Sequence, residues 1–181
     1  MDLTAPEIRV LGCLLEKQRT TPDQYPLSLN ALRLACNQST NRDPVVDYDE
    51  ATIRDALQRL SRRRWARLAS GHSSRASKYR HLLDEALGLS PGELSLLTVL
   101  MLRGPQTPGE LKGRAERLHP FASLQDVHAT LGRLGERDLV VCRDRRPGQK
   151  EDRYEQLLGA DEAPGVAQPV AAAPTVQAPV P

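Results

Sequence analysis

The chain lacks the features that place a protein in a membrane or outside the cell. Its 181 residues contain no apolar run near the ~18–20 residues that a membrane-spanning helix needs. The N-terminal segment carries Asp2 and Glu7 where a signal peptide would carry Lys or Arg. Only three cysteines are present, an odd count without close spacing, which argues against a disulfide framework. We therefore expect a cytoplasmic protein without membrane contact.

Cysteine and histidine are also too sparse to indicate a metal centre or a catalytic site. No C-x-x-C or H-x-x-x-H pair occurs, whereas a structural zinc site needs about four converging ligands. Cys13 and Cys36 lie in apolar helical patterns, which is typical of buried cysteines. Neither a Gly-rich phosphate loop nor a nucleophile elbow is present. We expect no cofactor, no metal and no enzymatic activity.

Acidic residues are missing from one long stretch, although the whole chain has a formal charge of only +2. Between residues 59 and 81 there is no Asp or Glu, and eight basic side chains follow one another. They are Arg59, Arg62, Arg63, Arg64, Arg67, Arg75, Lys78 and Arg80. A local field of this kind attracts polyanions.

The last 23 residues, 159–181, lack Lys, Arg and aromatic residues and contain five prolines. Such a segment buries too little surface to offset its ordering entropy. We predict a disordered Ala/Pro-rich tail that acts as a spacer rather than as a Pro-rich ligand.

An internal repeat organises the rest of the chain. Thr4-Ala-Pro-Glu7 and Ser90-Pro-Gly-Glu93, 86 residues apart, each predict a capping box that opens an amphipathic helix. The same offset relates Thr21-Pro22 to Thr107-Pro108, and a second helix follows each, over 27–36 and 110–118. Third helices are predicted over 49–63 and 123–137. The strand pairs 65–69 with 78–82, and 139–143 with 153–157, then predict two hairpins.

Three helices followed by a hairpin is the order of a winged helix-turn-helix domain. The expected fold is mainly α with small β-hairpins (α+β), as two tandem winged helix-turn-helix domains plus the tail. We place the first domain at 1–85, the second at 86–158 and the tail at 159–181, with the domains joined around 84–90. Because each copy has few core residues, we expect the two to pack together.

Several longer strings resemble the YceH family of bacterial proteins. They lie at residues 11–18, 20–30, 34–38, 39–45, 78–81 and 102–111, and in the Arg-Pro-Gly…Glu-Asp-Arg-Tyr stretch that ends at Tyr154. The resemblance covers nearly everything before the tail. It implies two winged helices and a family without an assigned molecular function, and it supplies no site residues.

The basic stretch gives the best functional signal. In winged helices the third helix enters the major groove while the hairpin touches the DNA backbone or minor groove. We therefore expect a DNA-binding protein, such as a transcription regulator, that contacts double-stranded DNA. The candidate residues are Arg54, Gln58, Arg59, Arg62, Arg63, Arg64, Arg67, Arg75 and Lys78. The alternative is a solvated charged face, and Asp49, Glu50 and Asp55 favour it because carboxylates repel phosphate.

The polar loop 37–44 has two interpretations. Gln38, Asn41 and Arg42 either lie near a DNA backbone, or the loop caps the second helix and folds on itself. The second interpretation is favoured, since Asn and Asp dominate such turns for conformational reasons.

The second copy suggests a different role. Gly132 and Gly135 leave small residues on the outward face of its third helix, which permits close packing against the first copy or a second chain. A frayed helix end near Gly135 is the plainer explanation. The alternative function is thus a tandem winged-helix protein–protein interaction module without DNA binding, with a homodimer or protein partner on the second domain.

Overall fold

The computed structural model describes residues 1–69 and 76–159, which form seven α-helices and two small antiparallel sheets. The first half contains α1 (Ala5–Thr20), a 3-10 helix (Pro22–Gln24), β1 (Leu27–Ser28), α2 (Leu29–Asn37), α3 (Glu50–Arg62), β2 (Ala66–Leu68) and β3 (Lys78–His81). The second half contains α5 (Pro91–Arg103), α6 (Pro108–Arg114), α7 (Leu124–Glu136), β4 (Val140–Arg143) and β5 (Arg153–Gln156). The short helix α4 (Leu83–Leu87) joins them, so the predicted boundary after residue 85 falls inside a helix.

Side-chain caps begin the helices where the sequence predicts them. Thr4 and Ser90 accept hydrogen bonds from the amides of Glu7 and Glu93, whose carboxylates reach back to the cap amides. The Asp49 carboxylate caps α3 by accepting a hydrogen bond from the Thr52 amide. Each such cap contributes about 1 kcal/mol to helix stability. The two predicted capping boxes are confirmed.

Three short segments differ from the sequence prediction. Leu27 was expected in a helix but lies in β1, opposite Tyr79, because Ser28 is an extended N-cap residue and α2 starts after it. The helix predicted to reach residue 118 ends at Arg114, and turns follow it. Thr107, paired by sequence offset with Thr21, corresponds in the structure to Ser28, since both cap the second helix of their half.

The two halves repeat one another strand by strand. In the first, the order of the sheet is β1-β3-β2, all antiparallel. In the second, β4 pairs with β5, and Gln106, just before α6, forms an antiparallel bridge to Tyr154. Because Leu27 faces Tyr79 just before α2, the Gln106 bridge is the counterpart of β1.

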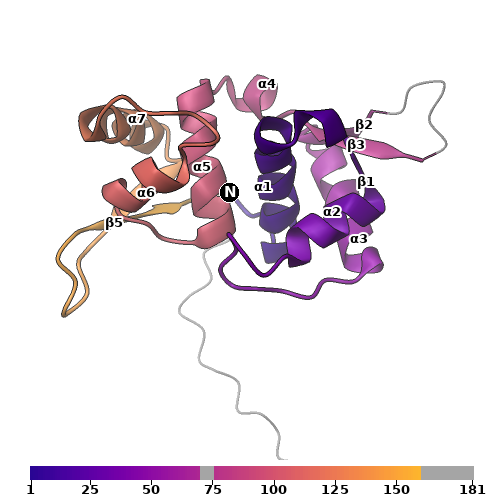
Figure 1. Ribbon diagram of the computed structural model, residues 1–181, viewed down its shortest axis with the longest axis horizontal. Coiled ribbons are helices and arrows are strands. Elements are labelled where there is room, and N and C mark those ends of the chain that lie inside the picture. The colour runs from indigo at the N-terminus through magenta and orange to yellow at the C-terminus, as the bar shows by residue number, and fades with distance from the viewer. Residues whose placement is uncertain (70–75, 160–181) are drawn as a thin grey trace, which may run out of the picture.

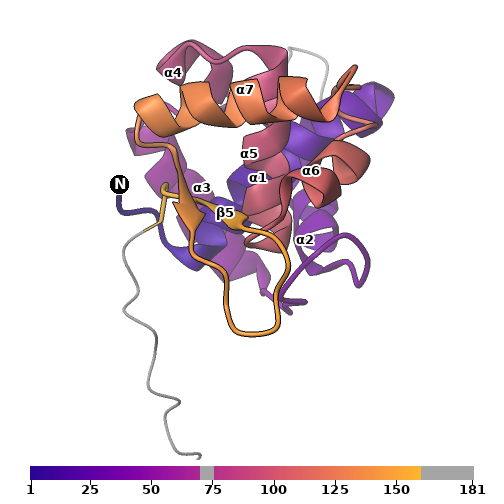
Figure 2. The ribbon, with the colours of Figure 1, turned by 90° about the vertical axis from the view of Figure 1, so that its left-hand side faces the viewer.

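The halves pack together through their equivalent first helices, as expected. α1 and α5 lie side by side at the centre of the molecule, with α2 and α3 on one flank and α6 and α7 on the other (Figures 1 and 2). At the contact, a Cβ added to Gly12 would lie 2.8 Å from Leu102 Cδ2 and 3.3 Å from Met101 Cβ. Glycine therefore permits the close approach. A hydrogen bond from the Leu3 amide to the Leu158 carbonyl (3.0 Å) also joins the two halves.

Candidate nucleic-acid interface

The third helix of the first half, α3, presents the predicted polar face. Ile53, Ala56, Leu57 and Leu60 are buried at helical spacing, which turns the opposite face to solvent. The residues predicted for that face are all exposed: Arg54, Asp55, Gln58, Arg59 and Arg62. The apolar periodicity of the sequence therefore predicts the orientation of α3 correctly.

Two of the arginines that were predicted to contact DNA form ion pairs with carboxylates. Arg54 forms an ion pair with Glu50 at 2.6 Å, and Arg59 pairs with Asp55 at 2.9 Å, each one helical turn away. Such exposed pairs are worth about 0.3–0.5 kcal/mol, which a phosphate can readily displace. Even so, these two ion pairs add no net positive charge to the N-terminal part of α3.

The C-terminal end of α3 has a different charge balance. Arg62 and Arg64 are exposed and form no ion pair with any residue that the structure describes. Arg63 pairs with Asp2 at 2.5 Å and lies 5.9 Å from the centre of the Trp65 ring. The Arg63 hydrogen bond and charge lower the pKa of the Asp2 carboxyl.

The sheet that follows α3 brings two further arginines together. Arg67 on β2 pairs directly with Arg80 on β3, and both belong to the outer face because their neighbours Ala66 and His81 are buried. The Nε of Arg80 is buried and has no hydrogen-bond partner among residues 1–69 and 76–159. Lys78 lies half-buried at the start of β3. The predicted contact Arg75 lies outside the described residues.

The polar loop folds onto the protein. Arg42 is only 6% exposed, and its guanidinium contacts both carboxylate oxygens of Glu16 at 2.8 and 3.0 Å. Gln38 hydrogen-bonds to Lys17 and to the Thr40 carbonyl. The idea of Arg42 at a DNA backbone is therefore wrong, because the side chain is buried between α1 and α2. Asn41, also proposed there, accepts a hydrogen bond from Arg103 on α5.

The outward face of α7 is open at Gly132, although Arg133 on the same helix forms an ion pair with Glu93 on α5. Nothing in the structure lies within 4 Å of a Cβ added to Gly132, so the predicted packing against the first copy is wrong for the described residues. The helix continues through Gly135 to Glu136 rather than fraying before it. In the following hairpin, Arg143 pairs with Glu155 and Arg145 pairs with Asp152.

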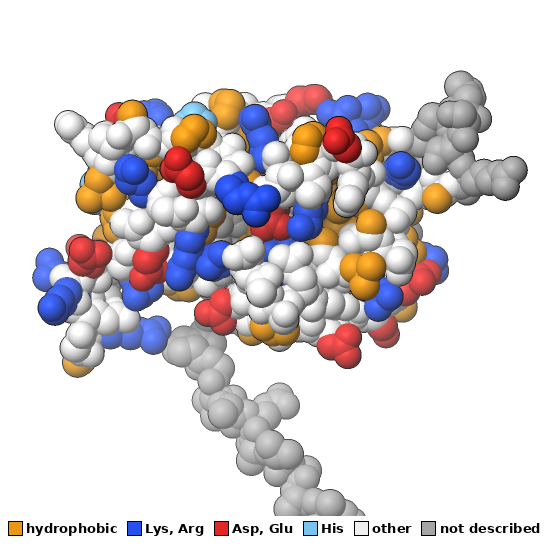
Figure 3. All heavy atoms as spheres, in the orientation of Figure 1, with side chains coloured by type: hydrophobic (Ala, Val, Ile, Leu, Met, Phe, Trp, Pro, Cys, Tyr) orange, Lys and Arg blue, Asp and Glu red, His pale blue; other side chains and the backbone are white. Residues whose placement is uncertain are grey.

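A second basic cluster is not apparent from the sequence. Lys17, Arg103, Arg114 and Arg117 line a cavity of about 350 Å³ between the two halves. Lys and Arg side chains gather across the middle of this face (Figure 3). Because these residues come from separate segments of the chain, no local run of basic residues in the sequence indicates the cluster.

Metal ligands, cysteines and membrane-spanning helices are the other features that could indicate a function in the part of the chain that the structure describes. No group of three or more His, Cys, Asp or Glu side chains is placed there to hold a metal ion. Cys13 and Cys36 are free thiols in the core, as predicted, and Cys142 is an exposed free thiol. None of the helices at 1–69 and 76–159 combines the length and apolar character needed to cross a bilayer.

Known proteins are similar to this chain over parts of both halves. A family model described as "Protein of unknown function, DUF480" matches residues 3–149. A UPF0502 protein of Pelobacter propionicus is 55% identical over 163 residues, covering 89% of this chain and 74% of the relative. A UPF0502 protein of Koribacter versatilis is 53% identical over 158 residues, covering 86% and 73%. One of Shewanella sp. (strain MR-4) is 49% identical over 170 residues, covering 90% and 77%.

Proposed function

The chain belongs to the DUF480 (UPF0502) family, and we propose that it is a double-stranded-DNA-binding protein of two winged-helix domains, 1–85 and 86–158. The family assignment agrees with the resemblance to YceH-type proteins noted in the sequence. That family is described as one of unknown function, so the proposal depends on geometry. We also propose a cytoplasmic location, in keeping with three thiols outside any disulfide.

The repeated order of elements supports the winged-helix assignment. Each half has three helices followed by two antiparallel strands, and in each an extended residue before the second helix pairs with the last strand. In a winged helix the third helix and the strand hairpin form one nucleic-acid-binding side. In the first half these elements are α3 and the pair β2–β3.

The observation that carries the proposal is the cross-strand pair of Arg67 and Arg80. Like charges directly opposite one another in antiparallel strands are destabilising by several tenths of a kcal/mol. A phosphate bound between their guanidinium groups removes that repulsion. Binding of a polyanion is therefore more favourable for these two arginines than exposure to solvent alone.

The charge distribution along α3 shifts the expected contact toward its C-terminal end. Glu50 and Asp55 lie in the N-terminal part, each beside an arginine that it neutralises. Arg62 and Arg64, which have no such partner among the described residues, precede β2 directly. We therefore assign the main phosphate contacts to Arg62, Arg64, Arg67 and Arg80, with Gln58 and Arg59 nearer the bases.

Charge reversal tests this assignment. We expect the double variant Arg62→Glu/Arg67→Glu to bind a fluorescent random duplex at least ten-fold more weakly than wild type at 50 mM salt. The slope of log affinity against log salt should shrink by about 2, because two phosphate contacts are lost. Fluorescence anisotropy between 50 and 200 mM salt measures both quantities.

The control is Arg145→Glu/Arg146→Glu, which makes the same change in charge in the turn between β4 and β5. After correction for the general electrostatic effect of the lost charge, its affinity for the duplex should lie within about two-fold of the wild-type affinity. Equal losses in the two variants would show a non-specific charge effect, and no duplex binding by wild type at 50 mM salt would refute DNA binding.

A protein–protein interaction module is the second candidate. The exposed face of α7 supports it, because Gly132 borders open space and Leu124 is 44% exposed at the start of the same helix. A second copy of the chain or another protein would approach α7 closely there. Absence of duplex binding together with self-association in solution would favour this alternative.

A further inference from the structure

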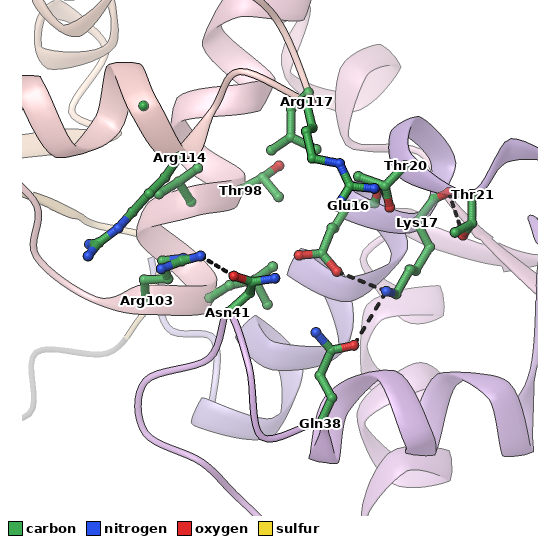
Figure 4. A pocket seen from close by; sticks show the side chains of 14 residues that line it. Glu16, Lys17, Thr20, Thr21, Gln38, Asn41, Thr98, Arg103, Arg114 and Arg117 are labelled. Carbon is green, nitrogen blue, oxygen red and sulfur yellow. Dashed lines mark hydrogen bonds and ion pairs between the residues drawn. The ribbon is translucent and has the colours of Figure 1, made fainter.

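The central cavity lies where four segments from both halves meet. α1 and the 37–44 loop contribute one side, and α5 and the segment around α6 contribute the other (Figure 4). Its volume of about 350 Å³ is within the range of small-molecule sites, roughly 300–1,000 Å³. Val99, Leu102 and Leu118 give it an apolar portion beside the charged groups.

Positive charge exceeds negative charge around this cavity. Four cationic side chains line it, and Glu16 is the only carboxylate among the lining residues. Glu16 is already engaged, because Arg42 contacts both of its oxygens and Lys17 Nζ lies 3.3 Å from one of them. The Arg42 hydrogen bonds and charge hold the pKa of Glu16 below its usual value despite the opposing effect of burial. Its charge therefore does not neutralise the remaining arginines.

Two of the three arginines of the cavity, Arg103 and Arg117, have no acidic partner among the described residues. Arg103 donates to the neutral side chain of Asn41. Arg117 forms no hydrogen bond or ion pair with any residue in the described ranges, and it extends from the second half toward the α1 side of the opening (Figure 4). Burial and the like charge of Arg114 lower the pKa of Arg103. Arg114 itself is held at the edge by Gln106 and Glu110.

The hydroxyl groups indicate what the rest of a ligand would look like. Thr20, Thr21 and Thr98 each donate to a backbone carbonyl one turn earlier, which leaves their oxygens free to act as acceptors. Hydroxyl groups of a ligand are suitable donors for them. The lining contains no aromatic side chain, so it offers no platform on which a nucleobase would stack.

We propose that this cavity binds a small phosphate ester with at least two negative charges and a hydroxyl-bearing body, of the sugar-bisphosphate class. Lys17, Arg103 and Arg117 hold the phosphate groups, because guanidinium and ammonium donors match phosphate oxygens. Since both halves line the cavity, the bound anion bridges them and stabilises the contact of α1 with α5. The inference is independent of DNA binding, which uses α3 and β2–β3, elements that contribute no residue to the lining of this cavity.

Calorimetric titration and thermal unfolding test the proposal on the full chain at 150 mM salt. The probes are fructose 1,6-bisphosphate, inorganic pyrophosphate, ATP and citrate. We expect the bisphosphate to bind and to raise the unfolding temperature. Arg117→Gln should weaken that binding at least ten-fold and, because Arg117 has no partner among the described residues, leave the unliganded protein folded. Arg146→Gln, which removes one exposed charge in the β4–β5 turn, is the matched control and should bind like wild type.

Four results would overturn the proposal. The first is the absence of binding by any phosphate probe, and the second is equal binding by wild type and Arg117→Gln. The third is a preference for citrate, which would identify a polycarboxylate site instead. A loss of duplex affinity in Arg117→Gln without any small-anion binding would also overturn it, since the cavity would then belong to the nucleic-acid surface. Failure of the duplex experiment on α3 leaves the calorimetric and thermal readouts unchanged.

Discussion

At the scale of single residues, His81 shows how a buried side chain ties the first half together. Its Nε2 lies 2.5 Å from the Gln18 amide oxygen on α1, and its Nδ1 accepts a hydrogen bond from the Leu83 amide. Its own amide donates to the hydroxyl of Tyr25, whose pKa burial raises to about 12. Both ring nitrogens are therefore occupied in the neutral form, with the proton on Nε2.

This arrangement predicts a pH dependence of stability. Burial lowers the pKa of His81 to about 4, although Asp84 opposes the shift and Arg80 and Arg19 reinforce it. The unfolded chain binds this proton near pH 6.5, so the stabilisation is complete above that pH and is lost as pH falls toward 4. We expect a loss of about 3 kcal/mol over this range from this group.

Urea denaturation of wild type and His81→Gln at pH 7.5, 6, 5 and 4 measures the effect. The free energy of unfolding of the variant should be lower than that of wild type at pH 7.5. It should also fall less between pH 6 and 4, because the variant lacks the His81 contribution. Parallel curves for the two proteins would contradict the assignment of a neutral, buried His81.

At the scale of elements, α3 and α7 end in the same way but carry different residues. Arg64 has φ 61° and Asp138 has φ 55°, and in each case the next amide bonds back to a carbonyl in the last helical turn, that of Leu60 or Leu134. This is the Schellman arrangement, in which glycine is the usual residue at the left-handed position. An arginine there costs stability but adds a charge where α3 meets β2.

Replacing each left-handed residue by glycine separates stability from binding. We expect Arg64→Gly and Asp138→Gly each to raise the free energy of unfolding by about 0.5–1 kcal/mol, because the left-handed strain is relieved. Only Arg64→Gly should weaken duplex binding. Chemical denaturation and anisotropy on the two variants give both answers, and a loss of stability in Arg64→Gly would contradict the strain argument.

The long elements were predictable from the sequence, whereas the short ones were not. Helices α1, α3, α5 and α7 follow from apolar periodicity and caps that operate within one segment. β1 has two residues and exists only because β3 pairs with it, so no local pattern marks Leu27 as a strand residue. α4 is similarly a five-residue helix that the sequence presented as a linker.

At the scale of the whole molecule, the contact between α1 and α5 decides how the halves sit. Gly12→Leu places a side chain against Leu102 and Met101, and we expect a loss of about 1–3 kcal/mol or more from overpacking. Gly132→Leu is the control, since open space surrounds that glycine and leucine has the higher helix propensity. It should raise the free energy of unfolding by up to about 1 kcal/mol.

Thermal unfolding compares the stability of the two variants, and sedimentation compares their association. If Gly132→Leu left self-association unchanged, the face of α7 would not be a close-packed dimer contact. Equal stability of Gly12→Leu and wild type would show that α1 and α5 can move apart to accept a larger side chain at little cost in free energy.

The sequence alone determined the long helices α1, α3, α5 and α7, which face of α3 is apolar, and the positions of the capping boxes and the two strand pairs. Those features depend on residues within a few positions of one another. Only the tertiary structure decided that Arg42 is buried against Glu16, that Arg67 faces Arg80, and that Lys17, Arg103 and Arg117 surround one cavity. Charges act through space, so their partners become visible only when distant parts of the chain are brought together.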